Sequence, residues 1–378
     1  MNSFTPSESL HIRNMPMYWR IRKPAQAPHA EIPGTFDLTV AYDTQARVVR
    51  QVLNEALLST LEAVYRAESN IGYLQEGHTL AKGYGSDLLA YIDRALADVE
   101  YQRVMEVGCG GCLVLSHLRG QGKEVVGVDP SPIAIQAGAQ AGIEVVADFF
   151  PPKAALHPAD LILHSDVLEH VPDPIAFLKS HHAYLNPRGM VLIAVPDCTE
   201  SIELGDLSML MHQHLSYFSR DSLHAVVSAA GFRVLDISKS GYGGSLYCLA
   251  MKDEQPSPLP AENGLDASYI ERAKRSLERV GQRIGQADAG YYMPLRAIPY
   301  LSALELQPPY RFFDDTAHWY AGFIDGTTVS IQNFQDLVTA PPAIVHVMSL
   351  TFGDLVANKI RSACPELQVT TLRSLLEA

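Results

Sequence analysis

VMEVGCGGC, residues 104–112, is the stretch that decides the fold of this 378-residue chain. An apolar strand runs into a turn that contains Gly108, Gly110 and Gly111, and a helix is predicted to begin near Leu113. Glycines let the backbone approach a ligand closely and supply positive φ where a turn needs it. The stretch therefore predicts a strand, turn and helix with a ligand held close to the turn.

An acid follows this turn at an informative distance. The apolar run 124–128 ends at Asp129, 21 residues after Gly108, and an acid at the tip of the second strand can hold both hydroxyls of a ribose. A dinucleotide requires a third glycine, but that position is Leu113. Glu106 lies two residues before Gly108 and fits the E/D-x-G-x-G loop of methyltransferases. The pattern favours S-adenosylmethionine over NAD as the cofactor.

Residues 103–252 alternate short β-branched runs with helical stretches, which predicts a doubly wound α/β sheet. The last two runs are separated only by residues 239–244, so we expect them to pair antiparallel at one edge. The runs are RVMEVG, EVVGVD, IEVVAD, DLILHSD, MVLIAVPD, FRVLDIS and SLYCLAM.

Two further motifs complete a resemblance. Asp148 and Phe149 close the third strand, and residues 160–173 read DLILHSDVLEHVPD. With the glycine turn and Asp129 in register, residues 103–252 resemble class I methyltransferases. The resemblance implies a Rossmann-like fold and S-adenosylmethionine as cofactor. It assigns the methionine part to Glu106, Gly108, Gly110 and Asp166, the ribose to Asp129, and the adenine to Asp148 and Phe149.

Polar side chains that could act on a substrate gather after the fifth strand. Residues 211–219 read MHQHLSYFS and lie where an open α/β sheet presents its substrate crevice. Imidazole titrates near neutral pH, so we take His214, His212 and Tyr217 as candidate catalytic residues. The alternative is that both histidines only cap the helix that starts near Arg220.

The segment HxHLSYFS, followed by Gly243-Gly244-Ser245-Leu246, resembles the C-methyltransferases that act on nucleotide-linked deoxysugars. That family carries an N-terminal zinc domain and a C-terminal Rossmann-like domain. The C-terminal domain is resembled here by residues 313–315, 322–326 and 343–348. The resemblance implies that His214 removes a proton from a carbon beside a keto group. We expect Tyr73, Gln213 and Tyr242 to contact the substrate.

The chain departs from this family at three places. The family usually has Glu before the catalytic His, whereas this chain has Gln213, which cannot take a proton. No cysteine precedes Cys109, so the zinc-binding tetrad is missing, and residues 35–40 are interpreted as a metal-free remnant. The turn expected near Tyr291 reads Met-Pro-Leu-Arg, residues 293–296, without glycine. We therefore expect an inherited architecture with a changed substrate.

The domain organisation follows from these patterns. We predict a small N-terminal helical cap over residues 1–69, with a helix from Gln45 to Arg66. The methyltransferase domain spans residues 70–252, a Pro-rich linker spans 253–265, and a second, smaller Rossmann-like domain spans 266–378. Asp266 is placed to cap the first helix of that last domain.

Composition excludes several classes of function. The formal net charge of −13 opposes binding to nucleic acid. No window approaches the roughly 18 apolar residues of a membrane span, and the N-terminus lacks a secretory core, so we expect a cytoplasmic protein without a membrane partner. Five scattered cysteines indicate reduced thiols. Cys109 and Cys112 form a CxxC without a second pair, and we predict no metal.

The sequence thus predicts an enzyme that transfers a methyl group from S-adenosylmethionine to a small molecule. Carbon methylation of a sugar or a natural-product intermediate, with His214 as base, is the first hypothesis. Oxygen or nitrogen methylation of a secondary metabolite is the second. A non-catalytic protein that has kept the cofactor fold is the third, and a dehydrogenase is disfavoured by Leu113.

Overall fold

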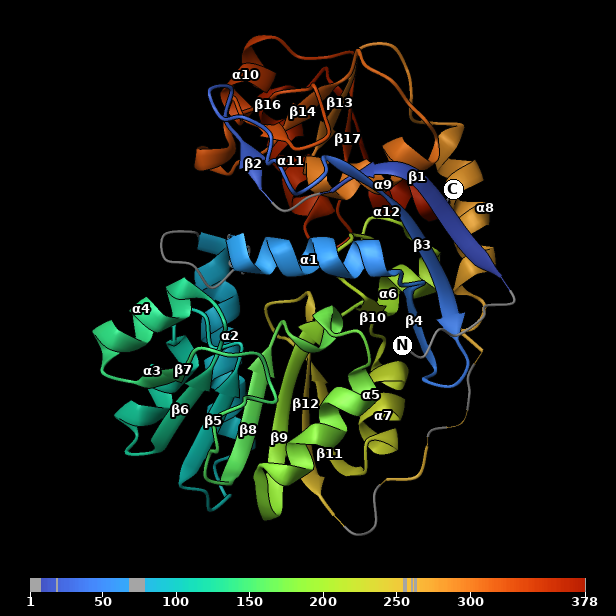
Figure 1. The fold of residues 1–378 in the computed structure, drawn as a ribbon. Helices are drawn as coiled ribbons and strands as arrows, with labels where there is room; N and C mark the ends of the chain where they lie inside the picture. Colours follow the sequence, from blue (N-terminus) through green and yellow to red (C-terminus); the bar gives the residue numbers. More distant parts are fainter. Residues whose placement is uncertain are drawn as a thin grey trace.

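A seven-stranded sheet forms the centre of the computed structural model, which describes residues 8–17, 20–67, 79–253, 257–259, 261 and 264–377 (Figure 1). The strand order is β11-β12-β9-β8-β5-β6-β7, and the five strands from β9 to β7 are parallel. β12 pairs antiparallel with β9 and β11, which confirms the predicted edge. The strands are β5 (Arg103–Val107), β6 (Glu124–Val128), β7 (Glu144–Val146), β8 (Ala159–Ser165), β9 (Leu185–Pro196), β11 (Phe232–Lys239) and β12 (Ser245–Lys252).

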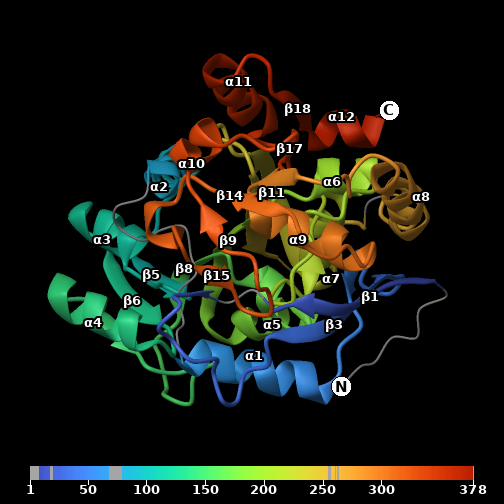
Figure 2. The same ribbon diagram turned by 90° about the horizontal axis from the view of Figure 1, so that it is seen from above.

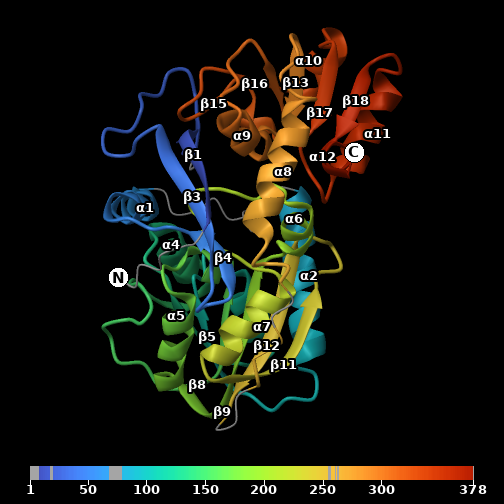
Figure 3. The ribbon, with the colours of Figure 1, turned by 90° about the vertical axis from the view of Figure 1, so that its right-hand side faces the viewer.

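Helices cover both faces of this sheet, because successive side chains of each strand point to opposite faces. In β5, Val104 packs in the cluster formed with α2 (Thr79–Ala95) and α3 (Leu113–Gly120). Its neighbour Met105 packs in the cluster formed with α5 (Pro174–Ser180) and α7 (Arg220–Ala229). Figure 3 shows α2 and α5 on opposite sides of the strands. The doubly wound architecture is confirmed.

The N-terminal region is a sheet as well as a helix. β1 (Ser9–Pro16), β3 (Thr35–Asp43), β4 (Val48–Gln51) and β10 (Ser216–Tyr217) form a four-stranded sheet in the order β1-β3-β4-β10. The helix predicted from Gln45 is wrong over β4, because the β-branched pair Val48 and Val49 is drawn into strand pairing on both sides. The described helix, α1, runs Glu55–Ala67, and Asn54 accepts a hydrogen bond from the Leu57 amide at its start.

The C-terminal unit is a five-stranded parallel sheet in the order β16-β14-β13-β17-β18, as in a Rossmann-like half. α8 (Tyr269–Gly281) leads into it. Its cap position is Ser268, and the prediction for Asp266 is wrong, because that carboxylate accepts a hydrogen bond from Ser219 Oγ instead, at 2.7 Å. The elements are β13 (Ala289–Tyr292), α9 (Pro294–Ala303), β14 (Arg311–Phe313), β16 (Ile331–Gln332), α10 (Phe334–Thr339), β17 (Ile344–Val347), α11 (Gly353–Ala363), β18 (Gln368–Thr371) and α12 (Leu372–Glu377).

The N-terminal sheet and the C-terminal unit share one hydrophobic core. Leu38 and Val40 of β3 belong to the same cluster of buried side chains as Ile298 of α9 and Phe312 of β14. β2 (Ile21–Arg22) also pairs with β15 (Phe323–Ile324). The two ends of the chain therefore pack as one body, although the sequence analysis predicts them as two separate regions.

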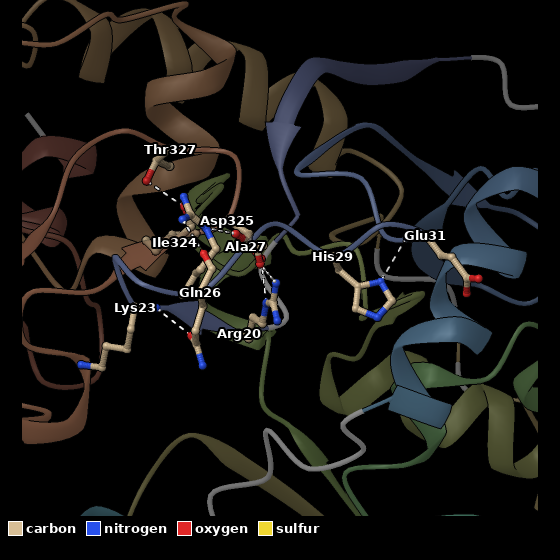
Figure 4. Close-up of polar contacts among 10 residues, drawn as sticks. Arg20, Lys23, Gln26, Ala27, His29, Glu31, Ile324, Asp325 and Thr327 are labelled. Atoms are coloured by element: carbon tan, nitrogen blue, oxygen red, sulfur yellow. Dashed lines mark hydrogen bonds and ion pairs between the residues drawn. The ribbon is translucent and has the colours of Figure 1, made fainter.

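Buried charges reinforce that junction. Asp325, which follows β15, accepts hydrogen bonds from Arg20 Nε at 2.9 Å and from Arg22 Nε at 2.8 Å (Figure 4). Its carboxylate is buried, so both guanidinium groups are held against it in partly desolvated positions. This contact ties β2 and the residue before it to the C-terminal unit.

In Figure 1, α1 lies above the carboxyl ends of the central strands and below the C-terminal unit, and Figure 3 shows it on the side of the molecule away from that unit. Seen from above, the C-terminal unit lies over the central domain (Figure 2). The carboxyl edge of the central sheet, where an α/β fold binds its ligands, therefore faces α1 and the C-terminal unit. No helix in the described part of the chain is both long and apolar enough to cross a membrane.

Candidate active site

The turn after β5 has the geometry that its glycines predict. Gly108 has φ of 72° and Gly110 has φ of 44°, a region that favours glycine. A Cβ at Gly108 would lie 2.5 Å from the Cγ2 atom of Val167, so the turn also needs a glycine for close packing. A Cβ at Gly111 would meet nothing within 4 Å, which leaves space in front of the turn.

Asp129 holds this turn in place. It follows β6, and its Oδ2 atom accepts a hydrogen bond from the Gly110 amide at 2.9 Å, while Oδ1 accepts one from the Ser131 amide at 2.8 Å. Each carboxylate oxygen has a second lone pair, so both can still accept from a vicinal diol. The predicted ribose acid is therefore fixed beside the glycine turn.

Two further acids adjoin the turn. Glu106 is buried, and its Oε2 atom has no hydrogen-bond partner in the described part of the chain. Burial raises the pKa of the Glu106 carboxyl well above its ordinary value, and burial raises that of Asp166 to about 6. Asp166 follows β8 with φ of 54°. A ligand that carries a sulfonium and an ammonium group would supply the positive charge that these carboxyls lack, so they fit S-adenosylmethionine.

Asp148 and Phe149 follow β7, the strand next to β6. Asp148 accepts hydrogen bonds from the Lys153 and Phe149 amides, both at 2.9 Å, and the bond from Lys153 holds the pKa of the Asp148 carboxyl below its usual range. The Phe149 ring is 43% exposed. An exposed ring beside an ionised acid suits an adenine. Substitution of Asp148 or Phe149, followed by a measurement of cofactor binding, would test this assignment.

The cysteines of the turn belong to the hydrophobic core. Cys109 and Cys112 are buried in a cluster with Leu115 and Ala134. Burial raises the pKa of the Cys109 thiol far above neutral pH, which leaves it protonated and a poor nucleophile. All five cysteines are free thiols. The absence of a metal stays a prediction.

The loop that carries His214 is tied to a short 3₁₀ helix, η1 (Leu168–His170), after β8. The Leu215 amide donates to the Glu169 carbonyl at 2.6 Å, and His170 Nδ1 donates to the Gln213 carbonyl at 2.8 Å. The rings of His170 and His214 meet edge to face, with centroids 5.0 Å apart. His214 is thus held next to the loop that carries Asp166.

Gln51 at the end of β4 supports the same loop from the N-terminal sheet. Its side-chain amide lies 3.0 Å from the Met211 carbonyl, 2.9 Å from that of His212 and 2.6 Å from that of His214. No sequence pattern singled out Gln51, because these partners are about 160 residues away.

Replacing Gln51 by leucine should leave these buried carbonyls without their donor, at a cost of about 1–2 kcal/mol in the free energy of unfolding. Urea unfolding of the variant measures this. The exposed Gln335→Leu substitution in α10 serves as the control and should cost far less. Equal stability of the Gln51 variant and the wild type would contradict the bracing role.

Of the other residues predicted in this region, Tyr217 lies beside His214, with ring centroids 6.4 Å apart. His212 turns toward the N-terminal sheet, where its Nε2 atom is 2.9 Å from the Phe36 carbonyl. Tyr217 is buried, and its hydroxyl donates to the Met211 carbonyl at 3.1 Å. Gln213 is buried as well. Ser219, not a histidine, caps α7.

Tyr242 lies in the turn between β11 and β12. Its ring meets Tyr84 of α2 edge to face at 4.9 Å and lies 6.3 Å from Phe352 of the C-terminal unit. It therefore bridges the central domain and the C-terminal unit. Tyr73, the other residue expected to contact the substrate, lies outside the described residues.

Sequence reasoning missed three residues beside His214. Glu169 and His170 belong to the LEHV motif, and Tyr65 comes from α1, with its hydroxyl 3.2 Å from His170 Nδ1. Ligating atoms of Glu169, His170 and His214 lie within 4.8 Å of one another. Among the described residues, these three are the group whose donor atoms could together hold a cation. Glu169 and His170, the two polar residues inside the LEHV motif, were the sequence feature that could have indicated these site residues.

Comparison with known proteins identifies the class of the central domain. Residues 80–237 match the family model described as a methyltransferase domain. These residues are a methyltransferase domain. The family depends on S-adenosylmethionine.

Individual relatives agree on the class of domain. The C-methyltransferase NovU of Streptomyces niveus is 29% identical over 242 residues, covering 56% of this chain and 58% of that protein. A ubiquinone biosynthesis O-methyltransferase of Azorhizobium caulinodans is 27% identical over 187 residues, covering 44% and 70%. The match with the first relative thus spans less than two thirds of its length.

Among solved structures, the methyltransferase domain resembles the 1,6-didemethyltoxoflavin-N1-methyltransferase of Burkholderia thailandensis. The sequence identity is 18% and the TM-score is 0.42, with 57% of this chain and 96% of that chain covered. The two curated relatives, a C-methyltransferase and an O-methyltransferase, differ in the atom that receives the methyl group, so the acceptor has to be argued from the site.

Proposed function

We propose that the chain methylates a small molecule at a carbon next to a keto group, with His214 as the base. The observation that carries the proposal is the position of His214. Its imidazole is grouped with Glu169, and the charge of Glu169 interacts with that of Asp166 in the cofactor site. A substrate held beside the glycine turn would therefore lie within reach of an imidazole.

The protonation state of His214 suits this role. Burial, with His170 and Arg296 nearby, lowers the pKa of the His214 imidazole well below its ordinary value, so the ring is neutral at pH 7. A neutral imidazole can accept a proton from carbon. Bound S-adenosylmethionine supplies an electrophilic methyl group, and the carbon that loses its proton uses the freed electron pair to form the new bond.

The C-terminal unit contributes a positive charge to the same place. Arg296 of α9 is close enough to His214 to lower its pKa, and its Nη1 atom donates to the Ser208 carbonyl at 3.2 Å. A guanidinium beside the base favours the negative charge that develops on an enolate oxygen. We therefore assign Arg296 to the substrate side of the site, and Tyr242 and Tyr73 remain proposed substrate contacts.

Relatives support the substrate class. NovU is a C-methyltransferase, so carbon methylation of a sugar or related intermediate is proposed first. Oxygen methylation is second, favoured by Gln213, an amide where the sugar family usually has Glu, and by the ubiquinone biosynthesis O-methyltransferase relatives. A cytoplasmic location, in keeping with the free thiols, and the absence of nucleic-acid and membrane partners complete the proposal.

Two measurements test this function. Calorimetry with S-adenosylhomocysteine should show micromolar binding, and NAD should not bind. The protein is then incubated with S-adenosylmethionine carrying a CD₃ group and either nucleotide-linked keto-deoxysugars or phenolic acceptors. Mass gain on a keto sugar with loss of one carbon-bound hydrogen supports carbon methylation. Gain on phenols alone moves the assignment to oxygen methylation, and failure to bind S-adenosylhomocysteine contradicts the cofactor assignment.

A further inference from the structure

Glu169, His170 and His214 bring three metal-ligating groups to one place. A carboxyl oxygen of Glu169 and one ring nitrogen of each histidine lie within 4.8 Å of one another. Glu169 and His170 belong to η1, whereas His214 lies in the loop before β10. The expectation of no metal rests on the isolated cysteine pair, and this second group of donors is assembled only by the fold.

The Glu169 carboxyl needs a partner of opposite charge. Its side chain is 1% exposed, and neither carboxyl oxygen has a hydrogen-bond partner in the described part of the chain. Buried charged groups are normally paired or coordinate a metal ion, because an isolated charge is costly to take out of water. Both oxygens of Glu169 are therefore open to a ligand, and Oε1 lies 3.7 Å from His170 Nε2.

His170 is held in the tautomer that a metal ligand requires. Its Nδ1 atom lies 2.8 Å from the Gln213 carbonyl, which can only accept, so Nδ1 carries the hydrogen. In the neutral ring the lone pair is then on Nε2, the nitrogen nearer to Glu169. Histidines that bind metals almost always donate their other ring N–H to a carbonyl, a carboxylate or water, which fixes the orientation of the ring. The Gln213 carbonyl has this role here.

Backbone contacts hold the two segments together without an ion. The Leu215 amide donates to the Glu169 carbonyl at 2.6 Å, and the Gln51 side chain donates to the His214 carbonyl at 2.6 Å. Zinc bonds of about 2.0–2.2 Å place the donors of a tetrahedral site roughly 3.3 Å apart. The distance of 3.7 Å between Glu169 Oε1 and His170 Nε2 is close to that spacing, so small movements of the side chains would close the site.

The donors and their surroundings select the class of ion. Two imidazoles and a carboxylate suit Zn²⁺ and other divalent transition metals, whereas Mg²⁺ and Ca²⁺ take oxygen ligands. The charge of Asp166 acts on Glu169, and the charge of Arg296 acts on His214. When ionised, the two carboxylates outweigh the single guanidinium by one negative charge. Three protein ligands also leave a coordination position for water, as in His₂Glu zinc sites.

We propose that Glu169, His170 and His214 bind a divalent transition-metal ion such as Zn²⁺, and that the bound ion blocks carbon methylation. The second part rests on the proposed function. A neutral imidazole has one lone pair, so a His214 ring that coordinates the ion cannot accept the proton of the substrate. The metal-free chain is then the active form, and removal of the ion returns the base.

Metal binding is tested first, because it needs no acceptor. The whole chain is treated with EDTA, desalted, and titrated with Zn²⁺ in a calorimeter and with Co²⁺ in a visible spectrometer. We expect one ion per chain, visible absorption bands from bound Co²⁺, and no binding of Mg²⁺. Glu169→Gln, His170→Asn and His214→Asn should each weaken Zn²⁺ binding by more than about 100-fold, since loss of an outer partner alone costs about 10–100-fold.

The matched control is His117→Asn. His117 also lies beside a carboxylate, with Nε2 2.7 Å from Asp93 Oδ1, but on α3 and away from the proposed site, so this variant should keep the wild-type affinity. Circular dichroism checks the folding of each variant. Wild-type affinity in a folded E169Q or H214N would overturn the proposal. Failure of the wild type to bind Zn²⁺ would overturn it even if every variant failed to fold.

The blocking role is tested once an acceptor is known. Turnover by the EDTA-treated chain should fall as Zn²⁺ is added, with the midpoint at the calorimetric Kd, and should return when EDTA is added in excess. Turnover that is lost in EDTA and restored by Zn²⁺ would overturn the blocking role. Binding is measured without methyl transfer, so a chain that binds Zn²⁺ as expected but methylates no keto sugar would contradict the proposed function alone.

Discussion

Replacing His214 by asparagine is expected to reduce carbon methylation by about 10²–10⁴-fold, the range of a general base. Asparagine is of similar size and polar, but it does not accept a proton at neutral pH. Because His214 is held through its backbone by Gln51 and by its neighbours on η1, the loop should keep its position. The measurement is initial rate with the accepted keto sugar, together with the Kd for S-adenosylhomocysteine.

The matched control is His212→Asn, two residues away on the same loop. His212 contacts the Phe36 carbonyl, so this variant should lose some stability and keep most of its turnover. The cofactor Kd should stay within about twofold of the wild-type value in both variants, since neither residue contacts the glycine turn. Unchanged turnover in H214N would remove His214 from the mechanism.

Replacing Asp129 by alanine should raise the Kd for S-adenosylhomocysteine by about 100-fold. Loss of the ribose contacts removes two hydrogen bonds to a charged group, each worth about 1.5 kcal/mol or more. The Gly110 amide also loses its acceptor, so the turn is less well ordered before binding. Calorimetry on the purified variant gives the Kd directly.

The Asp129→Asn and Asp148→Ala variants separate the contributions of the ribose contacts and the adenine contacts to the Kd for S-adenosylhomocysteine. The asparagine keeps one acceptor oxygen and should fall between the wild type and D129A. Asp148 is half-buried and, among the described residues, accepts hydrogen bonds from the nearby Phe149 and Lys153 amides, so its loss should weaken binding by about tenfold or less. A wild-type Kd for D129A would contradict the ribose assignment.

Local patterns predicted the central domain well. Positive φ at Gly108 and Gly110 and an acid at the end of the second strand are properties of neighbouring residues in one strand–turn–helix unit. Alternation of strands and helices then led to the parallel sheet and to the antiparallel edge formed by β11 and β12. These features depend on steric preference and side-chain periodicity, which short segments carry by themselves.

The N-terminal region was harder to predict for a physical reason. The helical stripe from Gln45 onward continues through β4, but Val48–Gln51 pairs with β3 on one side and β10 on the other. Apolar residues at helical spacing also suit a strand that is buried on both faces, as all four residues of β4 are. Strand partners far away in the sequence settled the choice.

The sequence by itself determined the class of domain, the glycine turn and its acids, because those groups lie within one continuous segment. Only the tertiary structure decided which side chains surround His214. Tyr65 is 105 residues from His170, and Gln51 is 163 residues from His214, yet both pairs are in contact. Such contacts arise because the N-terminal and C-terminal ends of the chain pack as one body over the carboxyl edge of the sheet, where burial then sets the proton affinities of Glu169 and His214.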